Sequence, residues 1–139
     1  MVKLLVGHKG SGKTKKMVQM ANDIAEGGTG SVVFINRDHR LMYDLKHAVR
    51  EVCMEEYEHI TNIDEYVGFI YGIISSNHDI EVIFIDGILK HADVHIPNIK
   101  DFLLRLQEIA THYNLDFVVS LSADMGELGD AIEGCTLLD

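Results

Sequence analysis

The chain has 139 residues, of which 47% are hydrophobic and one is proline. This length and composition leave room for one domain with a single hydrophobic core, which we expect to span residues 1–139. Lys and Arg number 12 against 22 Asp and Glu, a formal net charge of −10 that excludes a broad cationic surface. We therefore do not expect general nucleic-acid binding.

The sequence also bears on membranes and redox state. Met1 leads directly into an apolar segment without a signal peptide, and no apolar stretch approaches the ~20 residues of a membrane helix. Cys53 and Cys135 are far apart and show no metal-ligand spacing, which favours two reduced thiols. We expect a cytoplasmic protein with no membrane contact.

The first predicted elements are a strand, a glycine-rich loop and a helix. Residues 2–6 are an apolar run typical of a buried strand. Residues 7–14, here named the glycine loop, match the phosphate-binding pattern G-x-x-x-x-G-K-[ST]. Residues 14–26 carry one apolar helical face, which the glycines of residues 27–30 end.

The glycine loop has a physical rationale at each position. Glycines let the backbone curl so that its N–H groups point at phosphate oxygens. Lys13 would place a cation on the β- and γ-phosphates as the catalytic residue, and the Thr14 hydroxyl would ligate Mg²⁺. The N-terminus of the following helix attracts the same anion. The predicted nucleotide contacts are Gly7, His8, Lys9, Gly10, Ser11, Gly12, Lys13, Thr14 and Lys15. The alternative is a glycine-rich turn that carries Lys and Thr by chance.

The next segment predicts a strand and a second helix. Residues 31–36 are apolar and predict a buried strand. Apolar residues with helical spacing then predict an amphipathic helix over residues 41–52: Leu41, Leu45, Ala48, Val49 and Val52. After the acidic stretch that follows, we expect a short strand at residues 57–60.

The second half continues the alternation of strands and helices. Thr61 or Asn62 would cap a helix that extends to residue 74, with Asp64 or Glu65 completing a capping box. Residues 81–86 are an apolar strand ending in Asp86.

Pro97 suits the first turn of a further helix, which Asn114 would end in the left-handed conformation. Residues 115–122 are the next strand, and beyond residue 123 we expect a short helix at 125–132 and a strand at 136–138.

Alternating helices and continuously apolar strands predict a three-layer α/β/α fold with a mostly parallel sheet of about five strands. Ligands in such sheets bind outside the carboxyl ends of the strands. The glycine loop, Asp86, Ser120 and Ser122 all lie at those ends. We therefore expect these polar groups to converge at one edge of the sheet.

The apolar run that ends in Asp86 has the pattern of a Walker B segment, in which the carboxylate holds Mg²⁺ directly or through water. The alternative is an Asp that caps the next loop. Ser120 or Ser122 would sense the γ-phosphate, and we expect strand alternation to let only one of them point at the site. The alternative for both serines is a local hydrogen bond to the backbone.

These motifs resemble the P-loop nucleotide-binding superfamily over most of the chain. The order of elements is more similar to the RecA-like and thymidine-kinase-like branch than to the GTPase branch, and the chain is similar to small bacterial ATP-binding proteins. The resemblance implies the P-loop NTPase fold, with ATP or ADP and Mg²⁺ as ligands. No N-K-x-D motif is present, which favours ATP over GTP. The zinc-binding cysteine cluster of thymidine kinases is also absent from the sequence.

One departure concerns catalysis. The resemblance implies a glutamate as general base after the Walker B Asp, and this chain has Gly87 there. The possible replacements follow strand ends on the ligand side, although no spacing rule selects among them: His91, Asp93, Asp124 and Glu127. The alternative is that all four are ordinary loop residues. His91 and His95 have a helical metal spacing, but a loop with no third ligand disfavours a metal there.

We therefore expect an ATP–Mg²⁺-binding protein with weak or partner-stimulated ATPase activity that acts as a nucleotide switch. One alternative is a small-molecule, nucleoside-type kinase with an acceptor pocket built from residues 37–40 and 86–97. Another is a regulatory module that binds nucleotide without hydrolysing it. An unknown protein partner or self-association would complete the site.

Overall fold

The part of the chain that the structure describes contains one sheet of six parallel strands in the order β3-β2-β4-β5-β1-β6. The structure is a computed structural model that describes the backbone of residues 1–139 and all side chains except that of Lys90. The strands are β1 (Val2–Gly7), β2 (Ser31–Asn36), β3 (Val49–Cys53), β4 (Ile80–Ile85), β5 (Asp116–Ser122) and β6 (Thr136–Leu138).

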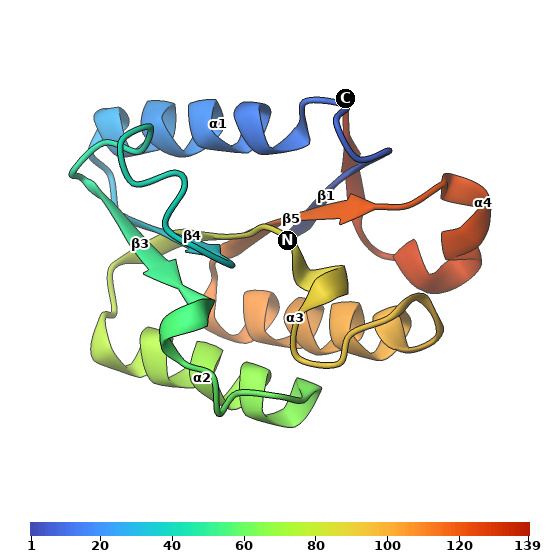
Figure 1. Cartoon of the computed structure of the whole chain (residues 1–139). Helices are drawn as coiled ribbons and strands as arrows, with labels where there is room; N and C mark the ends of the chain where they lie inside the picture. Colours follow the sequence, from blue (N-terminus) through green and yellow to red (C-terminus); the bar gives the residue numbers. More distant parts are fainter.

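Helices cover both faces of this sheet. The α-helices are α1 (Lys13–Gly27), α2 (Ile63–Ser76), α3 (Ile99–Tyr113) and α4 (Met125–Leu128). Single 3₁₀ turns occur at η1 (Met54–Glu56), η2 (Ile88–Lys90), η3 (Ile96–Asn98) and η4 (Gly129–Ile132). Helix α1 lies on one face, and α2 and α3 lie on the other (Figure 1). The predicted three-layer α/β/α class is confirmed.

Both faces of the central strands β2, β4 and β5 are largely buried, which explains their nearly continuous apolar runs. In β2, Val33 and Ile35 pack into the hydrophobic cluster beneath α2 and α3, whereas Val32 and Phe34 pack into the cluster beneath α1. Successive side chains of a strand point to opposite faces, so a parallel strand between two helical layers needs apolar residues at every position.

The helix ends confirm the predicted caps. Asn62 is the N-cap of α2: its side chain accepts a hydrogen bond from the Glu65 N–H at 2.9 Å. The Glu65 carboxylate accepts in return from the Thr61 N–H at 2.8 Å. Asn114 ends α3 with φ of 52°, in the left-handed region. Local side-chain chemistry therefore sets these boundaries.

The helix predicted over residues 41–52 is wrong. Residues 38–48 form turns, and residues 49–53 form strand β3, which pairs in parallel with β2. Val49 belongs to the apolar cluster beneath α1 and Val52 to the cluster beneath α2 and α3, as the two faces of a strand require. Val49 and Val52 have a spacing that fits a helix, but their β-branched side chains also favour a strand. Pairing with β2 makes this segment a strand.

The short strand predicted at residues 57–60 is also wrong. The chain leaves β3 through η1, and the Tyr57 N–H donates to the Met54 carbonyl at 2.9 Å. A turn follows, in which the Ile60 N–H donates to the Tyr57 carbonyl at 3.0 Å. Beyond residue 123, the predicted short helix corresponds to α4 and η4, and the predicted strand to β6. None of the described helices is long and apolar enough to cross a membrane.

Candidate functional site

The glycine loop joins the end of β1 to the start of α1. Gly10 and Gly12 have φ of 84° and 88°, a left-handed conformation that side chains disfavour. The loop closes on itself through a hydrogen bond from the Ser11 N–H to the His8 carbonyl at 3.1 Å. The glycines of the motif therefore stand where the backbone requires them.

The Lys13 side chain curls back over this loop. Its ammonium donates to the carbonyls of Gly7 at 2.9 Å and His8 at 2.8 Å, and to the Ser11 hydroxyl at 3.4 Å. Burial lowers the pKa of Lys13, and the nearby negative charge of Asp86 opposes that shift. A cation is thus held at the mouth of the loop.

Asp86 follows β4 and is 8% exposed. Its Oδ2 accepts a hydrogen bond from the Thr14 hydroxyl at 2.9 Å, and its Oδ1 accepts from the Ser120 hydroxyl at 2.5 Å. Strand β5 lies between β1 and β4 in the sheet, so it carries Ser120 to the carboxylate. Three residues predicted from separate segments therefore meet.

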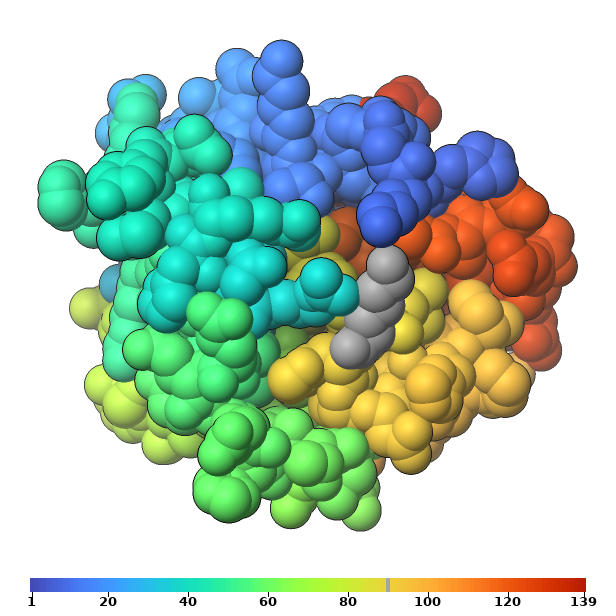
Figure 2. All heavy atoms as spheres, in the orientation of Figure 1, coloured from blue at the N-terminus to red at the C-terminus, as the bar shows by residue number. Residues whose placement is uncertain are grey.

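A cleft of about 850 Å³ opens above these groups. Figure 2 shows that the glycine loop (blue), the segment after β2 (cyan) and the segment after β4 (yellow) meet on one face of the molecule. The residues that line the cleft are Lys9, Gly10, Gly12, Lys13, Thr14, Lys15, Arg37, Arg40, Asp86, Gly87, Leu89, His95, Ile96, Pro97, Ser120, Ser122 and Glu127.

Most of the predicted contacts lie in this lining, with some differences. Gly7, His8 and Ser11 are not among the lining residues, and they hold the Lys13 ammonium instead. The expectation that only one of Ser120 and Ser122 would point at the site is wrong, because both line the cleft. Residues two apart on a strand share a face, so alternation does not separate them.

Gly87 stands next to Arg37, a contact that the sequence did not reveal. Its φ is 78°, and a Cβ at this position would lie 2.9 Å from Arg37 Cδ. The stem of Arg37, which follows β2, therefore lies across the glycine. The position at which a glutamate was expected is instead occupied by a residue small enough to leave space for an arginine at the cleft.

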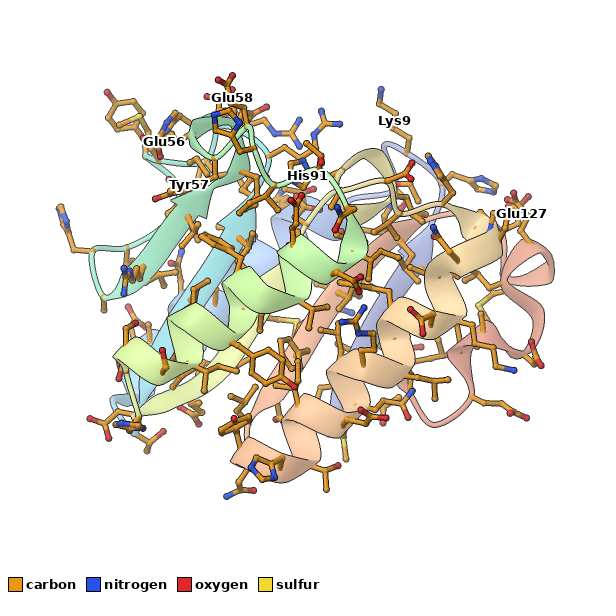
Figure 3. All side chains as sticks on the ribbon, turned by 90° about the horizontal axis from the view of Figure 1, so that it is seen from below. Lys9, Glu56, Tyr57, Glu58, His91 and Glu127 are labelled. Carbon is orange, nitrogen blue, oxygen red and sulfur yellow. The ribbon has the colours of Figure 1, made fainter. Side chains whose placement is uncertain are left out.

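The predicted replacement bases lie in different places. Glu127 lines the cleft, but its Oε1 already accepts from the Asp124 N–H at 2.9 Å. His91 packs edge-on against Tyr66, with ring centroids 5.9 Å apart. The Asp93 carboxylate accepts a hydrogen bond from His95 Nε2 at 2.9 Å. Figure 3 shows His91 and Glu127 along the edge of the molecule that also carries Lys9. Of the four candidates, Glu127 alone is among the described residues that line the cleft.

A second cavity of about 800 Å³ lies beside α1 and shares Thr14, Lys15 and Arg40 with the cleft. Its other lining residues are Val18, Gln19, Asn22, Asp23, Leu41, Asp44 and Lys46. The Asn22 side chain shapes the far wall: it donates to the Asp44 carbonyl at 3.0 Å and accepts from the Lys46 N–H at 2.9 Å. This wall belongs to the turns at residues 38–48. The sequence analysis predicted a helix over most of this segment, so it did not predict the cavity.

The chemistry of the cleft fits a phosphorylated ligand with a hard divalent cation. Thr14 and Asp86 offer hydroxyl and carboxylate oxygens, which Mg²⁺ prefers. Lys13, Arg37 and Arg40 supply positive charge in the same cleft. Comparisons with known proteins give no further guide, since no protein-family model matches the chain and no curated protein matches it.

Proposed function

We propose that this protein is a P-loop ATP-binding protein of the cytoplasm that takes ATP with Mg²⁺ in the cleft and hydrolyses it weakly or on stimulation by a partner. The observation that carries the proposal is the 2.9 Å hydrogen bond from the Thr14 hydroxyl to the Asp86 carboxylate. It joins the end of the glycine loop to the carboxylate of the second motif, and Mg²⁺ coordination in this class needs both groups together.

Different residues of the cleft would bind the phosphates and the Mg²⁺ ion. The backbone N–H groups of the glycine loop and the N-terminus of α1 would receive the phosphates. Lys13 would turn from the carbonyls of Gly7 and His8 toward the β- and γ-phosphates. Thr14 and Asp86 would hold Mg²⁺, while Ser120 keeps the carboxylate oriented. Bound ATP would supply the γ-phosphoryl group.

The surroundings of Gly87 support a low intrinsic rate. A general base must reach the attacking water. Among the described side chains of the cleft, Glu127 is the one predicted base, and the Asp124 N–H engages its Oε1. Arg37 stands over Gly87 and offers positive charge in place of a base. A nucleotide switch completed by a protein partner or a second copy is consistent with this arrangement.

The second cavity favours one alternative, a small-molecule kinase. It connects to the cleft through Thr14, Lys15 and Arg40, and its volume falls within the range of small-molecule sites. Asp23 and Asp44 could accept hydrogen bonds from the hydroxyls of a nucleoside-type acceptor. A phosphoryl acceptor seated there would lie next to the glycine loop.

The test is to measure ATP binding by calorimetry and phosphate release with Mg²⁺ in the full chain and in Lys13→Ala. Lys16→Ala is the matched control, because Lys16 is an exposed lysine of the same helix that lines neither cavity. We expect Lys13→Ala to weaken ATP binding at least about 100-fold, since it removes charge-assisted bonds to phosphate. Lys16→Ala should bind as the wild type does.

Equal affinity in Lys13→Ala and the wild type would overturn the proposal. Phosphate release that depends on Lys13 identifies an ATPase, and a rate per protomer that rises with protein concentration identifies self-association. ADP formation that requires an added nucleoside identifies the kinase. Tight binding with neither reaction identifies a regulatory module.

A further inference from the structure

A second polar cluster lies at the edge strand of the sheet, and none of its three residues lines the cleft. His39 belongs to the turns after β2, and Glu51 and Cys53 belong to β3. Their potential ligand atoms all lie within 4.8 Å of one another. We propose that His39, Glu51 and Cys53 bind one Zn²⁺ ion, with water as a fourth ligand. This proposal does not depend on nucleotide binding.

The spacing of the three side chains suits a small tetrahedral ion. Glu51 and Cys53 are two residues apart on β3 and therefore share one face of the strand. The Cys53 sulfur lies 3.1 Å from His39 Nδ1. Zinc bonds of about 2.3 Å to sulfur and about 2.1 Å to nitrogen place these atoms roughly 3.6 Å apart in a tetrahedron. The cluster would open by about half an ångström to take the ion, within the range of side-chain adjustment.

The Glu51 carboxylate points to a missing partner. Its Oε2 atom is buried and has no hydrogen-bond partner among the described residues. An unsatisfied acceptor of this kind is costly and uncommon in folded proteins. A cation between Glu51, His39 and Cys53 would satisfy that oxygen.

Two carboxylates lie near the far side of the His39 ring, at ion-pair distance rather than hydrogen-bond distance. While Nδ1 faces Cys53, Nε2 lies 3.8 Å from Glu55 Oε1 and 3.6 Å from Glu56 Oε2. In metal-bound histidines the second ring N–H donates to a carboxylate, which orients the ring and leaves its other nitrogen for the metal. Glu55 or Glu56 would complete this arrangement by moving closer to Nε2 when the ion binds. Figure 3 shows Glu56 at this edge of the molecule.

The donor types select the ion. One sulfur, one imidazole nitrogen and one carboxylate oxygen suit Zn²⁺, whereas Mg²⁺ and Ca²⁺ take oxygen ligands only. Metal binding would also tie the turn after β2 to β3. Because His39 lies between Arg37 and Arg40 in the chain, the ion would stiffen the segment that brings both arginines to the cleft.

The test is to titrate the chelator-treated full chain with Co²⁺ and then Zn²⁺. We expect Co²⁺ to bind with one equivalent and to produce a near-ultraviolet thiolate-to-cobalt absorption band, which Zn²⁺ then abolishes. The melting temperature should rise with Zn²⁺ concentration, because an ion that binds only the folded state stabilises it.

Matched variants identify the ligands. Cys53→Ser should remove the band and weaken Zn²⁺ binding at least about 10-fold, whereas Cys135→Ser should retain both. His39→Ala should weaken binding similarly, with the exposed His47→Ala as its control. Glu51→Gln keeps the shape of the side chain and provides a variant that folds if Cys53→Ser does not. The proposal is overturned if Co²⁺ gives no thiolate band, or if Cys53→Ser and Glu51→Gln both bind Zn²⁺ as tightly as the wild type.

Discussion

The carboxylates of Asp86 and Glu51 both belong to the sheet side of the molecule, but they differ in their hydrogen bonding. Asp86 follows the central strand β4, and both its oxygens accept hydrogen bonds from hydroxyls. Glu51 lies on the edge strand β3, and its buried Oε2 has no partner among the described residues. A central strand has neighbours on both sides to supply donors, whereas an edge strand has one. The comparison teaches that the central carboxylate has its donors in place before any ligand arrives, whereas one oxygen of the edge carboxylate has no donor among the described residues.

The largest effect expected from this comparison is the loss of ATP affinity when the Asp86 carboxylate is replaced. Asp86→Asn should weaken ATP binding in the presence of Mg²⁺ by about 10- to 100-fold, because the site loses a charged oxygen ligand. Calorimetry with Mg²⁺ and with a chelator separates the two contributions. In the chelator the variant and the wild type should bind ATP similarly, and an equal loss in both conditions would mean that Asp86 does not act through the metal.

Ser120→Ala tests whether the organisation of Asp86 contributes to stability. The substitution leaves a buried charged oxygen without its donor, so the free energy of unfolding should fall by about 1–2 kcal/mol. Ser122→Ala is the control, because Ser122 lines the same cleft but is exposed, and it should change stability by less than about 0.5 kcal/mol. Urea denaturation compares them, and equal values for the two variants would contradict the prediction.

Gly87→Ala tests the close approach of Arg37. We expect a loss of about 1–2 kcal/mol in the free energy of unfolding, because alanine disfavours the left-handed backbone and its Cβ would meet Arg37. Gly72→Ala is the control and should change the free energy of unfolding in the opposite direction. Gly72 is exposed inside α2 and has open space around it. That control should gain about 0.5–1 kcal/mol. Thermal denaturation of both variants checks the prediction, which fails if the two shift in the same direction.

Glu51→Gln tests whether the unpaired oxygen of the Glu51 carboxylate destabilises the folded protein in the absence of an ion. In a chelator, the free energy of unfolding of the variant should be higher than that of the wild type, because a neutral amide is easier to bury than a carboxylate. The gain should be less than about 1 kcal/mol, because the Glu51 carboxylate is partly exposed to water. With Zn²⁺ present, the wild type should become the more stable of the two. Denaturation in both conditions measures this reversal. A destabilised variant in the chelator would show that Glu51 is already well accommodated in the absence of an ion.

The smallest expected effect is a pH dependence of stability that arises from His91, which lies near Arg37. Burial lowers the pKa of His91 below its ordinary value of 6.5, and the Arg37 charge lowers it further. Between the folded-state pKa and 6.5 the unfolded chain therefore binds more protons, so stability falls as the pH drops through this window and is fully present above it.

Urea denaturation at several pH values measures that slope. We expect His91→Gln to flatten it, while the exposed His78→Gln should leave it as in the wild type. A wild-type slope in His91→Gln would place its origin in other groups.

The parts of the site that sequence analysis predicted depend on short-range signals. The glycines at positions 10 and 12 stand where the loop requires positive φ, and Asp86 and Ser120 follow apolar strands whose carboxyl ends share an edge. The sequence analysis also predicted that residues 37–40 and 86–97 share a pocket, and both segments line the cleft. The contact of Arg37 with Gly87 and the cluster of His39 with Cys53 gave no signal in the sequence. Each depends on a contact between segments that are distant in the chain.

By itself, the sequence determined the strands and helices outside residues 37–60, the shape of the glycine loop and the caps at Asn62 and Asn114. These features arise from neighbouring residues, whose backbone preferences and hydrogen bonds act within a few positions of the chain. Only the tertiary structure decided that residues 49–53 form β3, that Arg37 lies across Gly87 and that Glu51 faces His39 and Cys53. Pairing between β2 and β3 brings those groups together, because the ladder of hydrogen bonds and the burial of both faces outweigh the helical spacing of Val49 and Val52.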